Sequence, residues 1–391
     1  MRIGIVGLGL GGATAAAAMS QDGHDVTVFE QAPAIEEVGA GLALGPNAVR
    51  LLRGLGLGSR MAERGCVRSG EGLRNRVGTL LQSVTAEGGD GTPGYYFHRA
   101  ELLTTICELL DLERVRLGRR CTSAEESDDG VRVRFDDGSY EDVDLLVGAD
   151  GLRSVVLSSF FPATPLEYAN LVAYRGLVPN TVAHRHGVWA DGEKYFVVYP
   201  VSGGRLLNFV GVVPTAGRPD ESWSSEATVA DLRAEFIDWD APVLSVIDRV
   251  SRTFRWSLYT RAPLEHVTGR RVALLGDAAH PLLVHGGQGA GQAIEDAVAL
   301  GVLLRSASSN DVPERLALYE RLRLPRVTAV QQAVRRTARL LHRDVLLVEG
   351  EERPRPPEDT AWIADYDVGR EAQDLLHPTM RSHNRRPCTS S

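Results

Sequence analysis

Cysteine, lysine and long apolar runs are scarce in this chain of 391 residues. Its four cysteines, Cys66, Cys107, Cys121 and Cys388, form no CxxC pair and no zinc-type spacing with histidine. We therefore expect free thiols in a reducing cytoplasm and no metal site. Lys194 is the only lysine, and a net charge of -8 argues against a nucleic-acid partner. No run approaches the ~18 uninterrupted apolar residues of a transmembrane helix, so no membrane span is expected.

The chain is too long for one compact core, since domains usually hold about 100–200 residues. The N-terminal run predicts a buried strand over residues 2–7, a Gly-rich turn, a helix to about Gln21 and a strand from Asp25 to Glu30. Its regularly spaced glycines favour this βαβ opening over a cleaved signal peptide. Helices are expected over residues 46–58 and within 99–117.

A change of pattern separates the middle of the chain from its two ends. A hairpin is predicted at Asp137-Gly138, followed by a buried strand ending at Asp150. Between about 170 and 260, strand-like runs broken by glycine turns predict an antiparallel sheet. A buried strand returns at Arg271, and a helix is expected from about Gly289. The Arg-rich stretch 313–345 predicts a long helix with a solvated charged face and a kink at Pro325; the tail after 376 is expected to be disordered.

The first Gly-rich motif, Gly7-Leu8-Gly9-Leu10-Gly11-Gly12, stands between the first strand and the first helix. Such a turn lets the backbone approach a pyrophosphate at a helix N-terminus. Glu30 lies at the end of the second strand, where a carboxylate can accept hydrogen bonds from an adenosine ribose. This motif predicts dinucleotide binding but does not separate FAD from NAD(P).

Two further motifs follow buried strands. Asp277 ends the strand before 278–281, and a Gly-rich loop over 286–291 then starts a helix. A carboxylate there can bind the hydroxyls of a ribityl chain, and the helix N-terminus can stabilise negative charge on a reduced flavin. The run 147–154 places Asp150 in a Gly-x-Asp-Gly turn, which alone is also typical of an ordinary Asx turn.

Together GLGLGG, GADGLRS and GDAAHP resemble, in order and spacing, the signatures of single-component FAD-dependent aromatic hydroxylases. The stretches FHRAELL, AYRGLVP, YPVSGGRLLNFVGVVP and WIADYDV look like the salicylate hydroxylase branch, which includes hydroxybenzoate and hydroxynicotinate monooxygenases. The resemblance covers residues 1 to about 368. It implies hydroxylation of a small aromatic or phenolic substrate with NADH or NADPH and O2, through a C4a-hydroperoxyflavin. A cytoplasmic monomer or homodimer is expected.

The resemblance also implies a set of FAD-contacting residues, namely Gly7, Gly9, Gly11, Gly12, Glu30, Gln31, Arg99, Asp150, Asp277, Gly287, Gln288, Gly289, Ala290 and Gly291. Two positions depart from the family pattern. Val284 stands where many relatives carry proline beside the reactive edge of the flavin, and Gly291 where many carry asparagine.

The expected fold class is α/β with an antiparallel sheet: a Rossmann-like FAD-binding domain interrupted by a β-sheet substrate domain, with C-terminal helices. The FAD-binding domain is assigned residues 1–74, 99–168 and 269–312. The substrate domain is assigned a segment at 75–98 and the sheet at 169–268. The helical region is assigned 313–376, and the tail 377–391.

Candidate catalytic residues come from the middle sheet and the flavin loop. Tyr195 and Tyr199 alternate with Val197 toward one side of a strand and match active-site positions of the branch, although tyrosines of a sheet core would look the same. His285 sits beside Val284 in the loop before the helix at about Gly289, which we call the flavin loop (residues 282–291); either a proton acceptor or a surface histidine fits there. His280 is expected to be structural.

Two other functions remain open from the sequence. One is a flavin reductase or dehydrogenase of the same superfamily without oxygen insertion. The other is an FAD-binding protein without catalysis, for which Val284 is the hint.

Overall fold

A parallel five-stranded sheet forms one half of the computed structural model, which describes residues 1–35, 40–69, 71–84, 87–181, 187–215, 225–342 and 360–377. Its strands run in the order β19-β12-β1-β2-β8, and every pair is parallel. They comprise β1 (Arg2–Val6), β2 (Asp25–Phe29), β8 (Val115–Arg116), β12 (Leu145–Gly148) and β19 (Val272–Leu274). Most of their apolar side chains are buried, as expected for parallel strands covered on both faces.

Helices α1 (Leu10–Gln21) and α8 (Gly289–Leu304) pack against each other beside this sheet. The Ala-rich sequence of α1 favours a helix and allows close packing, and all of its residues from Leu10 to Met19 are buried. A Cβ at Gly301 of α8 would lie 2.8 Å from the Cβ of Ala18, so glycine is needed where the two helices touch. Helix α4 (Arg99–Cys107) also packs on α1.

Two small antiparallel sheets flank the parallel one. The first has the order β11-β10-β9, from β9 (Cys121–Glu126), β10 (Val131–Phe135) and β11 (Tyr140–Val143), and α5 (Val155–Phe160) packs on β9. The second has the order β3-β7-β4, from β3 (Gly41–Leu44), β4 (Cys66–Val67) and β7 (Tyr95–His98). Helices α2 (Pro46–Gly54) and α3 (Gly58–Arg64) connect β3 to β4.

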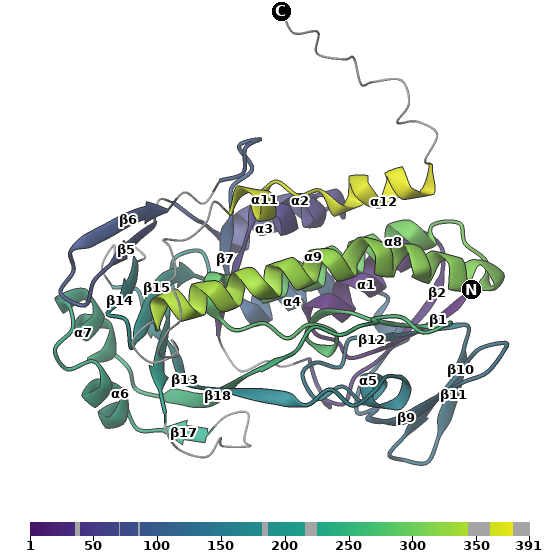
Figure 1. Ribbon diagram of the computed structural model, residues 1–391, viewed down its shortest axis with the longest axis horizontal. Coiled ribbons are helices and arrows are strands. Elements are labelled where there is room, and N and C mark those ends of the chain that lie inside the picture. The colour runs from purple at the N-terminus through teal and green to yellow at the C-terminus, as the bar shows by residue number, and fades with distance from the viewer. Residues whose placement is uncertain are drawn as a thin grey trace, which may run out of the picture.

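An eight-stranded sheet forms the other half of the molecule (Figure 1). Its order is β17-β18-β13-β16-β15-β14-β5-β6, antiparallel except between β14 and β5. The strands are β5 (Glu71–Arg74), β6 (Leu80–Val84), β13 (Leu166–Pro179), β14 (Gly187–Ala190), β15 (Tyr195–Val201), β16 (Leu206–Pro214), β17 (Ser225–Ala227) and β18 (Thr253–Arg261). One face packs on α6 (Val229–Glu235) and α7 (Ala241–Ile247), whereas the other packs on residues 282–284 and on α9.

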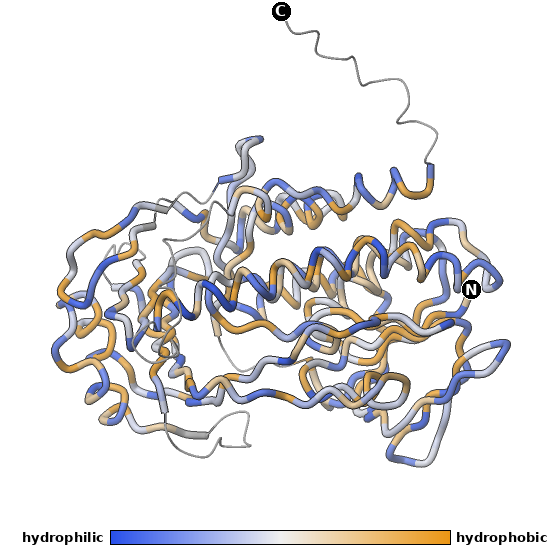
Figure 2. The backbone as a smooth tube through the Cα atoms, viewed as in Figure 1, coloured by the Kyte–Doolittle hydropathy of each residue, from blue (hydrophilic) through white to orange (hydrophobic). Residues whose placement is uncertain are grey.

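Helix α9 (Val312–Leu341) spans the two halves, from α8 at its start to β15 at its end (Figure 1). It continues as one helix through Pro325. Hydrophilic and hydrophobic residues alternate along it (Figure 2). The short helices α11 (Ala361–Ala364) and α12 (Val368–Leu376) follow, and α12 packs on α8 and α9.

The structure confirms the βαβ opening, the hairpin at Asp137-Gly138, the antiparallel middle and the returning strand and helix. The helical pattern within 99–117 extends too far, since α4 ends at Cys107 and a turn leads into β8. The solvated face expected for the Arg-rich helix is wrong at Arg323 and Arg326, which are buried. His184, His186, Cys388 and the tail from 378 lie outside the described residues.

Cys66, Cys107 and Cys121 are free thiols, as expected. Within the described ranges, none of the helices combines the length and the apolar character that a membrane span requires.

Candidate active site

The Gly-rich turn after β1 is glycine for reasons that the backbone imposes. Gly7 has a φ of 101°, and a Cβ there would collide with the carbonyl oxygen of Ala149. A Cβ at Gly12 would collide with the carbonyl oxygen of Gly7. Gly11 is closely approached as well, because a Cβ there would lie 2.6 Å from Leu275 Cδ1. These three glycines therefore allow the turn to pack closely against β12 and α8.

Gly9 differs from its neighbours because the space beside it is open. A Cβ at Gly9 would meet no atom within 4 Å, and no side chain caps the N-terminus of α1 there. The same holds at the start of α8, where Gln288 makes no side-chain cap and Gly289 faces open space. Two uncapped helix N-termini facing open space fit a ligand with phosphate oxygens at one end and an electron-rich ring at the other.

Glu30 joins the Gly-rich turn to the end of β2. Its carboxylate accepts a hydrogen bond from the Leu8 amide at 2.7 Å and another from the Ala32 amide at 2.8 Å. A carboxylate has about four acceptor positions, so Glu30 keeps capacity for ribose hydroxyls. Gln31 is exposed beside it.

Asp150 has a structural task in addition to its predicted one. Its carboxylate accepts hydrogen bonds from Ser154 Oγ at 2.5 Å and from the amides of Val155 at 2.7 Å and Val156 at 3.1 Å. It thereby caps α5, and burial raises its pKa. The Asx-turn alternative accounts for these contacts, while the side chain remains half-buried and next to the Gly7 turn.

Asp277, at the carboxyl end of the parallel sheet, interacts electrostatically with Arg99. Asp277 follows β19, and its side chain retains exposed surface although protein surrounds it closely enough for burial to raise its pKa. Arg99, at the start of α4, is the main charge opposing that rise. An accessible carboxylate at the carboxyl end of a parallel sheet is placed to bind the hydroxyls of a ligand.

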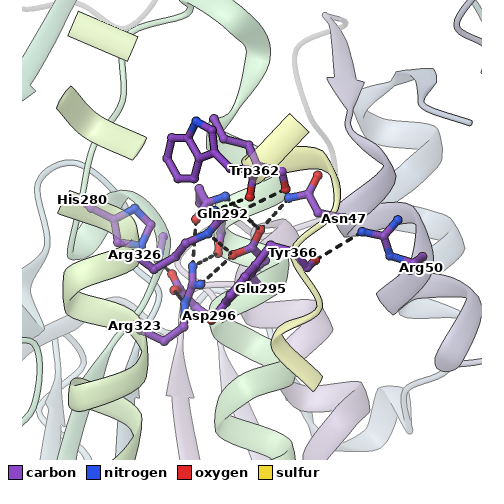
Figure 3. A network of polar contacts seen from close by, with 12 residues as sticks. Asn47, Arg50, His280, Gln292, Glu295, Asp296, Arg323, Arg326, Trp362 and Tyr366 are labelled. Atoms are coloured by element: carbon purple, nitrogen blue, oxygen red, sulfur yellow. Dashed lines mark hydrogen bonds and ion pairs between the residues drawn. The ribbon is translucent and has the colours of Figure 1, made fainter. Parts of the chain in front are cut away.

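A buried ionic network (Figure 3) holds the backbone of Gly276, the residue before Asp277. Asp296 accepts hydrogen bonds from the Gly276 amide at 2.9 Å and pairs with His280. Arg323 pairs with Asp296 at 2.7 Å and with Glu295 at 2.6 Å. Burial works to raise the pKa of Asp296, but the charges of His280 and Arg323 hold it below its usual range. His280 is therefore structural, as predicted.

The predicted strand alternation places Tyr195, Val197 and Tyr199 on one face of the eight-stranded sheet, opposite Phe196 and Val198. Both tyrosines are buried. The Tyr195 ring lies 5.7 Å from the His285 ring, between centroids. The face that carries them is the one turned toward the flavin loop.

His285 is fully buried, so the surface alternative is wrong. Its Nε2 lies 2.9 Å from Nε2 of His342, while its Nδ1 has no hydrogen-bond partner. Burial, and then the proximity of His342, lowers its pKa well below the ordinary value. The neighbouring Val284 has a φ of -66°, the value that proline would impose. The departure from the family pattern therefore leaves the backbone in a proline-like conformation.

Two polar residues on the same sheet face were missed from the sequence. Arg175 of β13 stacks on Trp256, with 4.3 Å from Cζ to the ring centroid, and its Nε has no hydrogen-bond partner. Burial lowers its pKa to about 10, and no carboxylate of the described residues forms an ion pair with it. Asn208 of β16 is fully buried, accepts from the Gly41 amide at 2.7 Å, and leaves Nδ2 unpartnered. Strand alternation with Leu171 and Ala173 could have placed Arg175 on this buried face.

Comparison with known proteins agrees with this geometry. Residues 1–334 match the family model described as FAD binding domain. The chain is 40% identical over 359 residues to 3-amino-4-hydroxybenzoate 2-monooxygenase of Streptomyces cremeus, covering 88% of each chain. It is 32% identical to a salicylate hydroxylase of Pseudomonas putida, covering 87% of this chain and 86% of that protein.

Solved structures show the same fold. A substrate complex of salicylate hydroxylase has a TM-score of 0.82 and 25% identity, covering 95% of this chain and 97% of that one. Klebsiella pneumoniae HpxO complexed with FAD and uric acid has a TM-score of 0.77 and 30% identity, covering 88% and 89%. The chain therefore belongs to the FAD-binding-domain family and is an FAD-dependent monooxygenase of the aromatic hydroxylase type.

Proposed function

We propose that the protein hydroxylates an aromatic acid that carries a phenolic hydroxyl, using NAD(P)H and O2. One oxygen atom enters the ring and the other leaves as water, while NAD(P)H supplies the two electrons. Bound FAD supplies the redox chemistry that links these half-reactions. The proposal depends most on one observation, the half-buried Arg175 side chain, whose buried Nε has no hydrogen-bond partner and which no carboxylate of the described residues neutralises.

The residues at the carboxyl end of the parallel sheet fit an extended FAD. The uncapped start of α1 at Gly9 would hold the pyrophosphate, and Glu30 the adenosine ribose. Asp277 would bind the ribityl hydroxyls with Arg99 beside it. The loop Gly287–Gly291, at the start of α8, would face the flavin ring and stabilise negative charge there. The predicted contacts of Gln31 and Asp150 remain part of this proposal.

The surroundings of Arg175 favour a substrate that carries an anionic substituent on its aromatic ring. A charge that is partly removed from water is costly unless it is paired, so the half-buried guanidinium of Arg175, without a carboxylate partner, favours a ligand that brings one. Asn208 leaves a second donor, Nδ2, on the same face. Tyr199 acts electrostatically on Arg175 and stacks on Tyr96 at 4.3 Å. An arginine with aromatic neighbours is suited to a planar carboxylate.

The position of His285 favours a substrate with a phenolic hydroxyl. It enters from the flavin loop beside Tyr195, and its unpartnered Nδ1 can accept a proton or a hydrogen bond. Removing the phenolic proton makes the ring more nucleophilic. Tyr195 and Tyr199 would hold the ring on the sheet side. The relatives act, by their names, on a hydroxybenzoate and on salicylate, both of which carry a carboxylate and a hydroxyl.

The test of the proposed carboxylate contact compares hydroxybenzoates with the matching hydroxybenzamides in the parent and in Arg175→Met. Loss of one charge-assisted hydrogen bond costs about 1.5–3 kcal/mol, or roughly ten- to over a hundredfold in affinity. The parent should prefer the acid by about that factor, and Arg175→Met should lose the preference. Arg252→Met is the matched control, because Arg252 also stacks on an aromatic ring, Phe254, but is exposed.

Binding is read from perturbation of the flavin absorption spectrum, and turnover from product per NAD(P)H. An Arg175→Met variant that keeps the preference, or that loses FAD and not substrate affinity, would contradict the assignment. His285→Ala and Tyr199→Phe should keep normal FAD content while slowing or uncoupling hydroxylation. The loss for His285→Ala should be about 10²–10⁴-fold on the chemical step.

A further inference from the structure

The imidazole of His285 belongs to a chain of hydrogen bonds that ends on a backbone carbonyl. His342, which follows the last turn of α9, places its Nε2 2.9 Å from Nε2 of His285. Its other nitrogen, Nδ1, lies 2.6 Å from the carbonyl oxygen of Glu193, just before β15. The two rings are nearly perpendicular, at 86°. These hydrogen bonds thus connect His285, the end of α9 and the residues just before β15 of the eight-stranded sheet.

The carbonyl oxygen of Glu193 determines which nitrogen donates in each of these hydrogen bonds. A carbonyl oxygen only accepts, so Nδ1 of His342 must carry the proton. In a neutral ring, Nε2 of His342 is then an acceptor, and Nε2 of His285 must donate to it. A neutral His285 with a proton on Nε2 has a lone pair on Nδ1, the nitrogen without a partner.

Both rings are in surroundings that favour the neutral form. Burial lowers the pKa of His342, and the Glu193 carbonyl and Asp191 oppose this effect only in part. Burial likewise lowers the pKa of His285. An isolated buried histidine could exchange between two tautomers, but the Glu193 carbonyl removes that choice for the pair.

We propose that His342 is a positioning residue, which fixes His285 as the tautomer whose Nδ1 can accept the phenolic proton. The inference rests on the proposed function of His285, and it names how that function is prepared. The proton moves from the phenolic oxygen to Nδ1 and leaves a phenolate next to a His285 imidazolium; the opposite charge of the phenolate offsets the burial that otherwise disfavours the charged ring. The imidazolium still donates a hydrogen bond from Nε2 to Nε2 of His342, so neither ring has to turn when His285 takes up the proton.

The direct test is nitrogen NMR of histidine in the oxidised holoenzyme, since an unprotonated ring nitrogen resonates far from a protonated one. The His285 and His342 signals are assigned by their loss in His285→Gln and His342→Leu. The expected pattern is unprotonated Nδ1 on His285 and unprotonated Nε2 on His342. A protonated Nδ1 on His285 would overturn the proposal. This readout does not require turnover, so it separates failure of the inference from failure of the proposed function.

Variants supply the second readout. His342→Leu removes the acceptor and should allow His285 to populate the other tautomer, whereas the carbonyl of His342→Gln can still accept. We expect His342→Leu to lower the hydroxylation rate and product per NAD(P)H roughly threefold to tenfold, the size expected for one neutral hydrogen bond. KM and FAD content should hold, and His342→Gln should recover part of the loss.

His24→Leu is the matched control, because His24 also contacts a backbone carbonyl, that of Leu304 at 3.0 Å, far along the chain from this pair. It should leave the rate and the His285 signals unchanged. If His342→Leu keeps the parental tautomer of His285 and the parental coupling, or if His24→Leu reproduces its losses, His342 has no positioning role.

Discussion

Replacing Arg323 by methionine should destabilise the protein and loosen the Asp277 turn. Arg323 is 1% exposed and pairs at once with Glu295 and Asp296, which are equally buried. Methionine fills much of the same space but supplies no charge. Two buried carboxylates then lose a partner, and Asp296 is the one that holds the Gly276 amide next to Asp277.

The magnitude follows from the partners that remain. Removing one side of a buried ion pair costs about 3–5 kcal/mol. Glu295 keeps Arg326 at 3.2 Å and Asn47 at 2.6 Å, and Asp296 keeps His280 (Figure 3). We therefore expect a loss near the lower end, about 3 kcal/mol. For a chain of this length that corresponds to a fall in Tm of roughly 4–6 °C.

The assay is thermal unfolding at one scan rate, followed by tryptophan fluorescence and by the release of flavin fluorescence. Arg305→Met is the control, since Arg305 forms an exposed pair with Asp22 at 3.0 Å and should contribute at most about 1 kcal/mol. An Arg323→Met variant that melts within 1 °C of the Arg305→Met variant would refute the reasoning. Flavin release below the main transition would show that the Asp277 turn opens first.

Three further substitutions test the residues proposed to surround the FAD. Asp277→Asn should weaken FAD binding by roughly tenfold or more, measured by equilibrium dialysis. Burial raises the pKa of Asp277, so ionisation of this carboxyl destabilises the FAD-free fold above the ordinary pKa of 3.8. FAD-free Asp277→Asn should therefore have a higher Tm than the FAD-free parent at pH 7. This difference in Tm should shrink as the pH falls toward 3.8. Gly7→Ala should abolish flavin retention or folding, because its φ of 101° and the Ala149 carbonyl exclude a Cβ; normal yellow protein would contradict this. Val284→Pro should fold and bind FAD normally, with a Tm equal to or above that of the parent, because the φ of -66° already suits proline; loss of the flavin would show that the loop is not proline-compatible.

Local patterns predicted the parts of the site that lie close together in sequence. The turn from Gly7 to Gly12 and the strand end at Asp277 combine hydrophobic runs with glycine spacing, and each acts within one strand–turn–helix unit. Alternation along β15 was enough to place Tyr195 and Tyr199 on one face.

Contacts between distant elements were not predictable in this way. The burial of His285 depends on the end of α9 and on His342, which follows it and is 57 residues from His285 in sequence. The arginines of α9 repeat as a solvated face would, yet Arg323 meets two acids of α8 in the interior. Arg175 sits in an ordinary strand pattern, and its lack of a carboxylate partner emerges only when the surrounding elements are placed in space.

The proposed reaction inserts an oxygen atom from O2 into an aromatic acid at the expense of NAD(P)H. It is tested most directly by single turnover of the purified holoenzyme with ¹⁸O2, NAD(P)H and a panel of hydroxylated aromatic acids, with products read by mass spectrometry. We expect, for at least one acid, a hydroxylated product that carries one ¹⁸O atom and close to one product per NAD(P)H oxidised. NAD(P)H oxidation that yields only hydrogen peroxide or a reduced organic product with every acid, or no NAD(P)H oxidation at all, would contradict it.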